Sequence, residues 1–332
     1  MEESKKSYYC PYIANGVHFV HDRIRFCSAN KQGPPLAKTY KGEDLNWDEI
    51  QKDRERLLRL LQEGQIPEEC EGCFNLNNPI YQTKYEIENT PKIKHLYISN
   101  WLHCNTGCIY CINKSLTHSK FDKKVKKSEY YDSYPIIENL VKNNILDKNA
   151  IITFTGGEPT VLKEFDKLLE IIAKHVTTPI NVLSSGIRFN KTIYNNLKKD
   201  KVLLVVSIDS GSRETYKKIK RVDEFNNVIN NLKKYAKASP TAGNHITSKY
   251  ILIDKVNDNI EEIEKWLNVI KSINIKNVRV DVEYSNSALS SKTIPKHYYD
   301  IFAFVKEKTQ ELGLNLESID QVNQILQKGY VF

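Results

Sequence analysis

The chain has 332 residues, of which 40% are hydrophobic and 27% charged, a balance typical of a globular protein with one large domain and a smaller appendage. No apolar run approaches the ~18 residues of a membrane-spanning helix, and the N-terminus lacks an apolar signal core, so we expect a cytoplasmic protein. The net charge of +8 is spread without one dense basic block, which favours a solvated surface over a nucleic-acid-binding face.

The first 90 residues contain a predicted hairpin, a predicted helix and four cysteines. Apolar and polar residues alternate over 17–27, as expected for two short strands. A mostly apolar stripe then predicts a helix of about four turns. The stripe consists of Ile50, Arg54, Leu57, Leu58 and Leu61. The four cysteines are Cys10, Cys27, Cys70 and Cys73. Four thiolates can hold a fully ligated [4Fe–4S] cluster or a structural zinc ion, and unpaired cysteines are a third alternative.

From residue 93 the pattern alternates between strands and amphipathic helices. The predicted strands are 93–99, 150–155, 179–184, 201–208, 248–253 and 277–283. This order predicts an α/β fold, with a partial parallel (β/α)6 TIM-like barrel over 91–290. Residues 1–90 are expected to form a small N-terminal α+β cluster-binding domain. A helix after Pro295 predicts a C-terminal helical extension over 291–332.

Three further cysteines, Cys104, Cys108 and Cys111, follow the first barrel strand with C-x3-C-x2-C spacing. Three thiolates on one loop can hold three irons of a cubane cluster, which leaves the fourth iron open for a substrate or cofactor. A zinc knuckle usually pairs C-x2-C with a second, distant pair, and a disulfide framework needs an oxidising compartment. We therefore favour an iron–sulfur site with an open iron.

Turns rich in glycine and hydroxyl groups end the next three strands, where barrels of this class carry their chemistry. The run Gly156-Gly157-Glu158-Pro159 ends the second strand, and its glycines allow a ligand to approach the backbone. Ser185 ends the third strand, and Ser207 and Asp209 end the fourth. These short polar side chains either bind a ligand or cap the following helices.

The cysteine spacing, the aromatic residue just before the third cysteine and the GGEP turn resemble the radical S-adenosylmethionine (radical SAM) enzymes. The resemblance covers about 93–285 well and the first 90 residues loosely. In that family the open iron is chelated by SAM, and an electron from the cluster cleaves SAM to methionine and a 5′-deoxyadenosyl radical. That radical takes a hydrogen atom from the substrate. The resemblance also implies an electron donor of the flavodoxin or ferredoxin type.

The resemblance assigns SAM contacts to residues of these turns. The backbone of Gly156, Gly157 and Glu158 is expected to bind the amino group of SAM. Tyr110 is expected to pack on adenine. The expected contacts of the ribose and methionine parts are Ser185, Ser207 and Asp209. Five residues on the last two barrel strands are candidates to face the substrate: Lys249, Tyr250, Asp281, Glu283 and Tyr284. His103 is expected to be a surface residue or to lie beside the ligands.

By the same resemblance, Cys10, Cys27, Cys70 and Cys73 hold an auxiliary cluster of the SPASM or Twitch type, although such extensions usually follow the barrel. The two clusters would use all seven cysteines, so no free thiol would return a hydrogen atom to the substrate radical. We therefore expect a net oxidation, as a dehydrogenation or a cross-link, of a carbohydrate, an amino acid or a peptide. Two alternatives remain, which are RNA modification and a zinc-stabilised binding protein that does not use SAM.

Overall fold

The computed structural model describes residues 7–20, 23–26, 47–71, 92–111, 131–283 and 296–317. The chain divides into two compact units, each assembled from separate segments. The first unit comprises Met1–Leu102, Lys127–Gly156 and Glu164–Ile180. The second unit comprises His103–Lys126, Gly157–Lys163 and Asn181–Phe332. Within the described ranges, no helix has the length and apolar character needed to cross a membrane.

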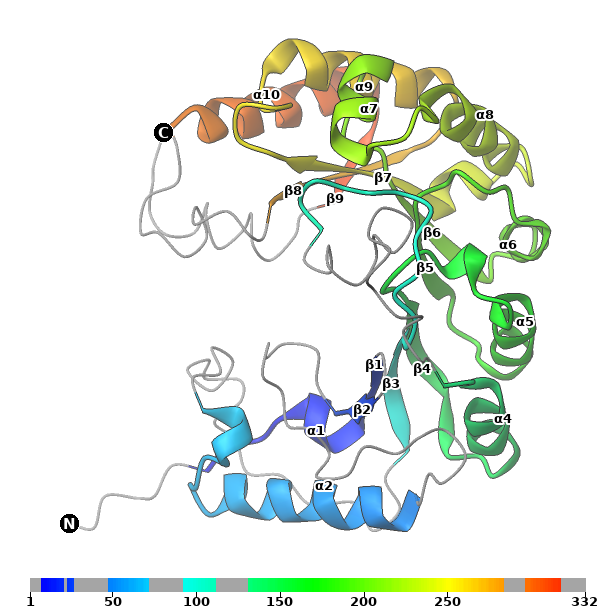
Figure 1. Cartoon of the computed structure of the whole chain (residues 1–332), viewed down its shortest axis with the longest axis vertical. Helices are drawn as coiled ribbons and strands as arrows, with labels where there is room; N and C mark the ends of the chain where they lie inside the picture. Colours follow the sequence, from blue (N-terminus) through cyan, green and yellow to red (C-terminus); the bar gives the residue numbers. More distant parts are fainter. Residues whose placement is uncertain are drawn as a thin grey trace, which may run out of the picture. The chain divides into compact units, whose positions relative to one another are not determined.

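The first unit contains strands in the order β2-β1-β3-β4, labelled in Figure 1. Its strands are β1 (Gly16–Val20), β2 (Arg23–Arg25), β3 (Ile93–Ser99) and β4 (Leu146–Phe154). Its helices are α1 (Pro11–Asn15), α2 (Trp47–Gln62), the short 3-10 helix η1 (Glu68–Cys70), α4 (Tyr134–Lys142) and α5 (Phe165–His175). Strand β1 is antiparallel to β2 and parallel to β3, and β3 is parallel to β4.

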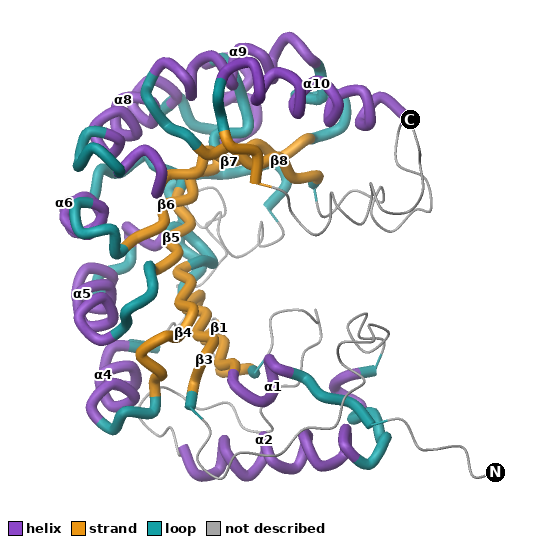
Figure 2. Tube along the Cα trace, turned by 180° about the vertical axis from the view of Figure 1, so that it is seen from behind, coloured by secondary structure: helices purple, strands orange, loops and turns teal. Residues whose placement is uncertain are grey.

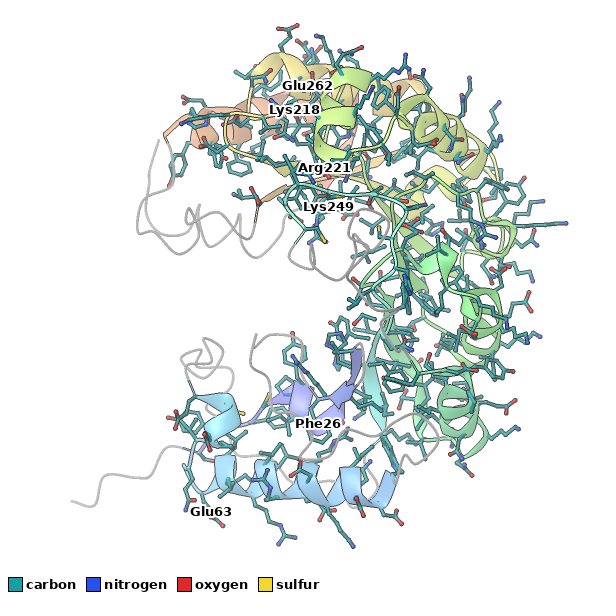
Figure 3. All side chains as sticks on the ribbon, viewed as in Figure 1. Phe26, Glu63, Lys218, Arg221, Lys249 and Glu262 are labelled. Atoms are coloured by element: carbon teal, nitrogen blue, oxygen red, sulfur yellow. The ribbon has the colours of Figure 1, made fainter. Side chains whose placement is uncertain are left out.

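The N-terminal hairpin and helix form as their patterns predict. Strands β1 and β2 pair in antiparallel register, and all five residues of the α2 stripe are buried. Arg54 belongs to that stripe. Its guanidinium donates a 3.0 Å hydrogen bond to the carbonyl of Gly16 and lies 5.0 Å from the ring centroid of Phe26, which faces α2 (Figure 3). Burial lowers the pKa of Arg54 to about 10. The parallel pairing of β1 with β3 is not predicted, because alternation identifies a strand but not its partner.

The second unit continues the alternation of strands and helices, with its strands in the order β5-β6-β7-β8-β9. The strands are β5 (Ile180–Ser184), β6 (Val202–Ser207), β7 (Ile246–Leu252), β8 (Asn277–Val282) and β9 (Asn315–Glu317). The helices are α6 (Lys191–Leu197), α7 (Arg213–Lys220), α8 (Phe225–Ala236), α9 (Ile260–Ser272) and α10 (Lys296–Leu312), with 3-10 turns η4 (Pro159–Val161) and η5 (Ala242–His245). Every pairing from β6 to β9 is parallel.

The predicted α/β class with a mostly parallel sheet is confirmed, and the six predicted strands correspond to β3 to β8. The apolar stripe of α5, which consists of Phe165, Leu168, Leu169 and Ile172, is buried throughout. In the apolar stripe of α9, Ile263, Leu267 and Ile270 are buried, whereas Ile260, in the first turn, is 43% exposed. Strand β9 is not predicted, because all three of its residues are exposed and show no alternation of buried and exposed positions. The limits of the three expected domains remain predictions.

The two faces of β7 and β8 differ in character. Helices α9 and α10 cover one face (Figure 2), where the Trp266 indole N–H donates to the Ser248 hydroxyl at 2.9 Å and its ring packs on Tyr250. Successive strand residues point to opposite faces, so Lys249 projects away from α9. Its ammonium pairs with the Asp281 carboxylate of β8 at 2.6 Å. The face opposite the helices is therefore charged.

Candidate active site

The cysteine loop opens the second unit and is held by the backbone of α7. The Gly107 N–H donates to the carbonyl of Lys220 at 2.9 Å, and the Ile109 N–H donates to the carbonyl of Ile219 at 3.0 Å. Ile109 and Tyr110 also pack against the buried cluster formed by Ile219, Ile251 and Ile253. The loop therefore has a defined position against the end of α7.

Cys104, Cys108 and Cys111 are half-buried on this loop. The hydroxyl of Thr106 lies 3.1 Å from the sulfur of Cys104 and 3.4 Å from the sulfur of Cys108, so both thiols lie beside one polar group. Burial raises the pKa of the Cys104 thiol to about 11. Three soft sulfur donors on one anchored loop fit an iron–sulfur cluster with three protein ligands.

The glycine-rich turn is shaped by close backbone contacts. Gly156, in the first unit, has φ +99°, and a Cβ there would lie 2.9 Å from the Cβ of Ser99. Gly157 begins the segment that belongs to the second unit. In that unit the Glu158 N–H donates to the carbonyl of His103 at 2.8 Å, which ties the turn to the residue before Cys104.

The side chain of Glu158 is 1% exposed and fully engaged within the protein. Its carboxylate accepts hydrogen bonds from the hydroxyls of Thr160 and Ser184 at 2.6 and 2.8 Å, and from the Ser185 N–H at 2.6 Å. The Ser185 hydroxyl in turn donates to the Asn105 side-chain oxygen at 2.9 Å. Glu158 and Ser185 thus join the turn, the end of β5 and the cysteine loop. Their contacts with SAM remain predictions.

The side chains of Asp209 and Tyr110 contact each other through a hydrogen bond. Asp209 is fully buried with φ +60°, and one of its oxygens accepts from the Ile251 N–H at 2.8 Å. Its other oxygen accepts from the Tyr110 hydroxyl at 2.5 Å and pairs with the Lys220 ammonium. Ser207 is half-buried at the end of β6. Asp209 has no part in capping α7, because Ser212 is the N-cap.

The turn between Asp209 and α7 is held by Glu262 of α9 (Figure 3). The Glu262 carboxylate accepts from the N–H groups of Gly211 and Ser212 at 2.8 and 2.9 Å. A Cβ on Gly211 would lie 2.3 Å from the Glu262 carbonyl oxygen, so glycine is needed for this approach. Neither Glu262 nor Lys220 is identified by sequence motifs. A lysine on the buried stripe of α7, beside Tyr216 and Ile219, is the signal that points to Lys220.

The N-terminal cysteines can be placed only in part. Cys10 lies at the N-cap of α1, and Cys70 ends η1. Both are half-buried in the first unit. Cys27 and Cys73 lie outside the described residues. The auxiliary site therefore remains a prediction.

The substrate-facing candidates divide between the two faces of the sheet. Tyr250 is fully buried on the helix-covered face, where its hydroxyl donates to the carbonyl of Asn257 at 2.7 Å, so its side chain points away from the charged face. Lys249 and Asp281 lie on the opposite face as an ion pair. Glu283 is half-buried just after β8, and Tyr284 lies outside the described residues.

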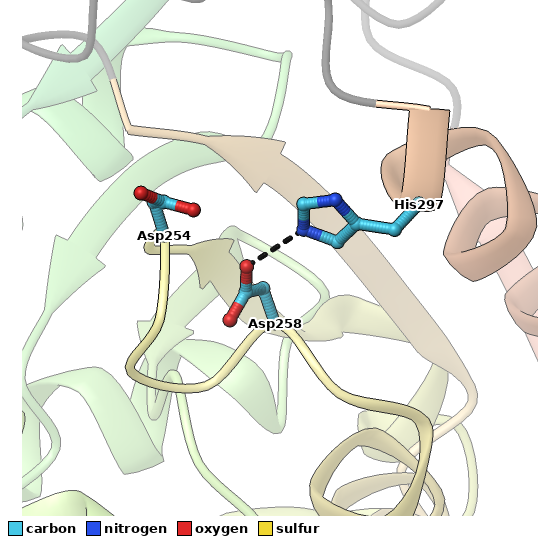
Figure 4. Close-up of side chains that lie close together, drawn as sticks. All are labelled: Asp254, Asp258 and His297. Carbon is cyan, nitrogen blue, oxygen red and sulfur yellow. Dashed lines mark hydrogen bonds and ion pairs between the residues drawn. The ribbon is translucent and has the colours of Figure 1, made fainter.

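A separate cluster joins the loop after β7 to the start of α10 (Figure 4). Ligand atoms of Asp254, Asp258 and His297 all lie within 4.8 Å of one another, and His297 pairs with Asp258 at 2.8 Å. Asp254 and His297 are exposed, as is common for surface ion pairs. This cluster is distinct from the thiol loop.

The chain resembles known proteins in sequence. The sequence profile of the Radical SAM superfamily matches residues 101–268. A protein named GTP 3′,8-cyclase, from Clostridium botulinum (strain Okra / Type B1), is 25% identical over 223 residues, which cover 66% of this chain and 68% of that protein.

Two solved structures share the fold. The structure described as native anSMEcpe with bound AdoMet and Cp18Cys peptide has a TM-score of 0.50 and 19% identity, covering 67% of this chain and 62% of that chain. Streptococcus suis SuiB bound to S-adenosylmethionine has a TM-score of 0.50 and 13% identity, covering 83% of this chain and 56% of that chain. The matched regions thus span less than two thirds of either solved chain. The profile match contains the cysteine loop, the glycine-rich turn and β5 to β7, and the chain belongs to the Radical SAM superfamily.

Proposed function

We propose that the chain binds SAM at a [4Fe–4S] cluster held by Cys104, Cys108 and Cys111 and uses it to take a hydrogen atom from a substrate. The chemistry supplied by the bound cluster and SAM is reductive cleavage to methionine and a 5′-deoxyadenosyl radical. One observation carries the proposal. The cysteine loop is fastened to the carboxyl ends of β5 and β6, by Ser185 to Asn105 and by Asp209 to Tyr110. Ligands of parallel α/β folds bind at these strand ends.

The residues of the chain contribute position and polarity to this chemistry. Glu158 keeps Ser184 and Ser185 in place through buried hydrogen bonds. Its side chain is committed to these contacts, so in this proposal the backbone of Gly157 and Glu158 meets the amino group of SAM. Ser185 and Ser207, which are both half-buried, are the proposed contacts for the ribose and methionine parts, and Tyr110 is the proposed contact for adenine. Asp209 is left out of the proposed contacts, because it is fully buried and both of its oxygens are engaged within the protein.

We propose that the charged face of β7 and β8 contacts the substrate. The Lys249 ammonium and the Asp281 carboxylate lie 2.6 Å apart, and the Arg279 guanidinium lies 3.4 Å from the same carboxylate. Lys249 adjoins the end of β6, because its carbonyl accepts from the N–H groups of Ile208 and Asp209. Paired charges suit a substrate with both hydrogen-bond donors and an anionic group, as in a sugar acid, an amino acid or a peptide.

The proposed reaction is a net oxidation, with an auxiliary cluster at Cys10, Cys27, Cys70 and Cys73 accepting the substrate electron. An electron donor of the flavodoxin or ferredoxin type in the cytoplasm completes the proposal. A nucleotide substrate is the second candidate, supported by the relative named GTP 3′,8-cyclase and by the cations of Lys249 and Arg279.

Release of 5′-deoxyadenosine tests the proposed function. Anaerobically purified protein with dithionite and SAM is expected to release 5′-deoxyadenosine and methionine in equal amounts. Cys108→Ala should abolish the release, because a two-thiolate loop cannot retain the cluster. The Cys70→Ala/Cys73→Ala variant is the matched control, since it also removes thiols but should leave SAM cleavage largely intact. Cleavage by Cys108→Ala at the wild-type rate would contradict the proposal.

A further inference from the structure

Three polar side chains from separate segments meet at the end of the cysteine loop. Lys220 is 2% exposed and Asp209 is fully buried, and the two form an ion pair. The Lys220 ammonium also donates to the Tyr110 hydroxyl at 2.8 Å. The Tyr110 hydroxyl donates to the Asp209 carboxylate at 2.5 Å. Each group therefore contacts both of the others.

Each corner of this triad is fixed to a different element. The second oxygen of Asp209 accepts from the Ile251 N–H of β7, and the Asn257 amide donates to the Asp209 carbonyl at 2.8 Å. The carbonyl of Lys220 accepts from the Gly107 N–H of the cysteine loop at 2.9 Å. Lys220 thus holds the loop twice, through its backbone at Gly107 and through its side chain at Tyr110.

Apolar packing alone does not explain a lysine at this position. The buried residues of α7 are Tyr216, Ile219 and Lys220. Burying an ammonium requires a charged partner, and replacing such a buried pair as a whole by hydrophobic residues of similar size often gives equal or greater stability. Burial, the largest single cause, lowers the pKa of Lys220, but the Asp209 carboxylate and the nearby sulfurs of Cys108 and Cys104 together raise it by more, so the net pKa is raised and the ammonium remains charged. Such a buried pair suits a role in positioning its partners better than a role in stability.

We propose that Lys220 is a positioning residue, which fixes Tyr110 and the cysteine loop against the ends of β6 and β7 through its buried contact with Asp209. The cysteine loop would otherwise be joined to α7 by backbone contacts at Gly107 and Ile109 and by apolar packing. The inference rests on the proposed function only in so far as the loop binds the cluster. The anchoring itself belongs to the protein without iron.

Site-resolved alkylation of iron-free protein tests this inference. Wild type and variants are treated with iodoacetamide under native conditions, and the labelling rate of each cysteine is followed by mass spectrometry. Lys220→Met is expected to speed labelling of Cys104, Cys108 and Cys111 by about tenfold, because the loop opens locally. Cys10 and Cys70, from the first unit, are internal controls and should keep their wild-type rates. A general loss of stability would speed all five together.

Two further variants keep the test decisive. Lys218→Met makes the same change at an exposed position of the same helix (Figure 3) and should leave every rate unchanged. Tyr110→Phe removes only the hydroxyl and preserves the ion pair, so it serves if Lys220→Met does not fold. It is expected to speed labelling of the loop cysteines by about threefold, because the loop should open less than in Lys220→Met.

Selective labelling of the loop in Lys220→Met or Tyr110→Phe supports the inference. Unchanged loop rates in both variants, or an equal increase at all five cysteines, would overturn it. Because the protein carries no iron, the outcome does not depend on SAM cleavage. If wild type fails to cleave SAM while the loop opens selectively, the proposed function fails and the anchoring stands.

Discussion

The buried carboxylate of Glu158 offers a sharp test of how the glycine-rich turn is held. It accepts hydrogen bonds from the Thr160 and Ser184 hydroxyls and from the Ser185 N–H. In Glu158→Gln one oxygen becomes an NH2 group. Hydroxyl groups can rotate to accept from that NH2, but the Ser185 N–H cannot reverse its direction. The amide oxygen is therefore expected to face Ser185.

This arrangement leaves one donor without an acceptor. The Thr160 N–H donates at 3.2 Å to the oxygen that the amide nitrogen would replace. An unsatisfied buried donor costs about 1–3 kcal/mol, and loss of the charge weakens the remaining hydrogen bonds. We expect Glu158→Gln to lower the free energy of unfolding by about 2–4 kcal/mol.

Urea unfolding of iron-free protein, followed by circular dichroism, measures this change. Glu307→Gln is the matched control, because Glu307 is exposed on α10 and the same substitution there should leave the midpoint unchanged. If Glu158→Gln unfolds at the same urea concentration as Glu307→Gln, the carboxylate does not hold the turn through these hydrogen bonds.

Three further outcomes are expected. Metal analysis of wild type should find about eight irons, and that of Cys70→Ala/Cys73→Ala about four. Stoichiometric zinc in wild type would instead assign the N-terminal cysteines to a structural zinc site. Gly156→Ala should lower the thermal midpoint of unfolding. A non-glycine residue at φ +99°, packed against Ser99, should cost about 1–3 kcal/mol of folding stability. An unchanged midpoint would show that the turn adapts. Once a substrate is identified, the product formed in deuterated buffer should be lighter than the substrate by two hydrogens. An isomer with one solvent-derived deuterium would instead indicate epimerisation.

Local patterns predict much of the fold. The α2 stripe includes Arg54, and all five of its residues are buried. The hairpin and the six barrel strands appear as expected, because side-chain periodicity reports which face of an element is covered. Periodicity does not report partners, so the pairing of β1 with β3 and the addition of β9 beside β8 are not predicted.

Residue types and their spacing in the sequence identify the candidate site, but they do not predict which of its side chains contact one another. The C-x3-C-x2-C spacing and the GGEP turn identify the family, and the structure then joins Glu158 to Ser185. Lys220 and Tyr110 are separated by 110 positions, so no local pattern relates them. Tyr250 faces α9 rather than the charged face. The sequence does not predict this orientation, because β7 has buried residues on both of its faces and so shows no alternation of apolar and polar residues.

The proposed chemistry requires SAM to bind directly to an open iron, and electron paramagnetic resonance tests this binding. Dithionite-reduced Cys70→Ala/Cys73→Ala protein retains only the cluster proposed at Cys104, Cys108 and Cys111. Its spectrum is recorded before and after addition of SAM. A shift in the g-values of a [4Fe–4S] signal on addition of SAM is the predicted result, because a ligand to iron changes the electronic structure of the cluster. A cluster signal that SAM leaves unchanged, or the absence of any cluster signal, would contradict the binding of SAM to an open iron at this loop.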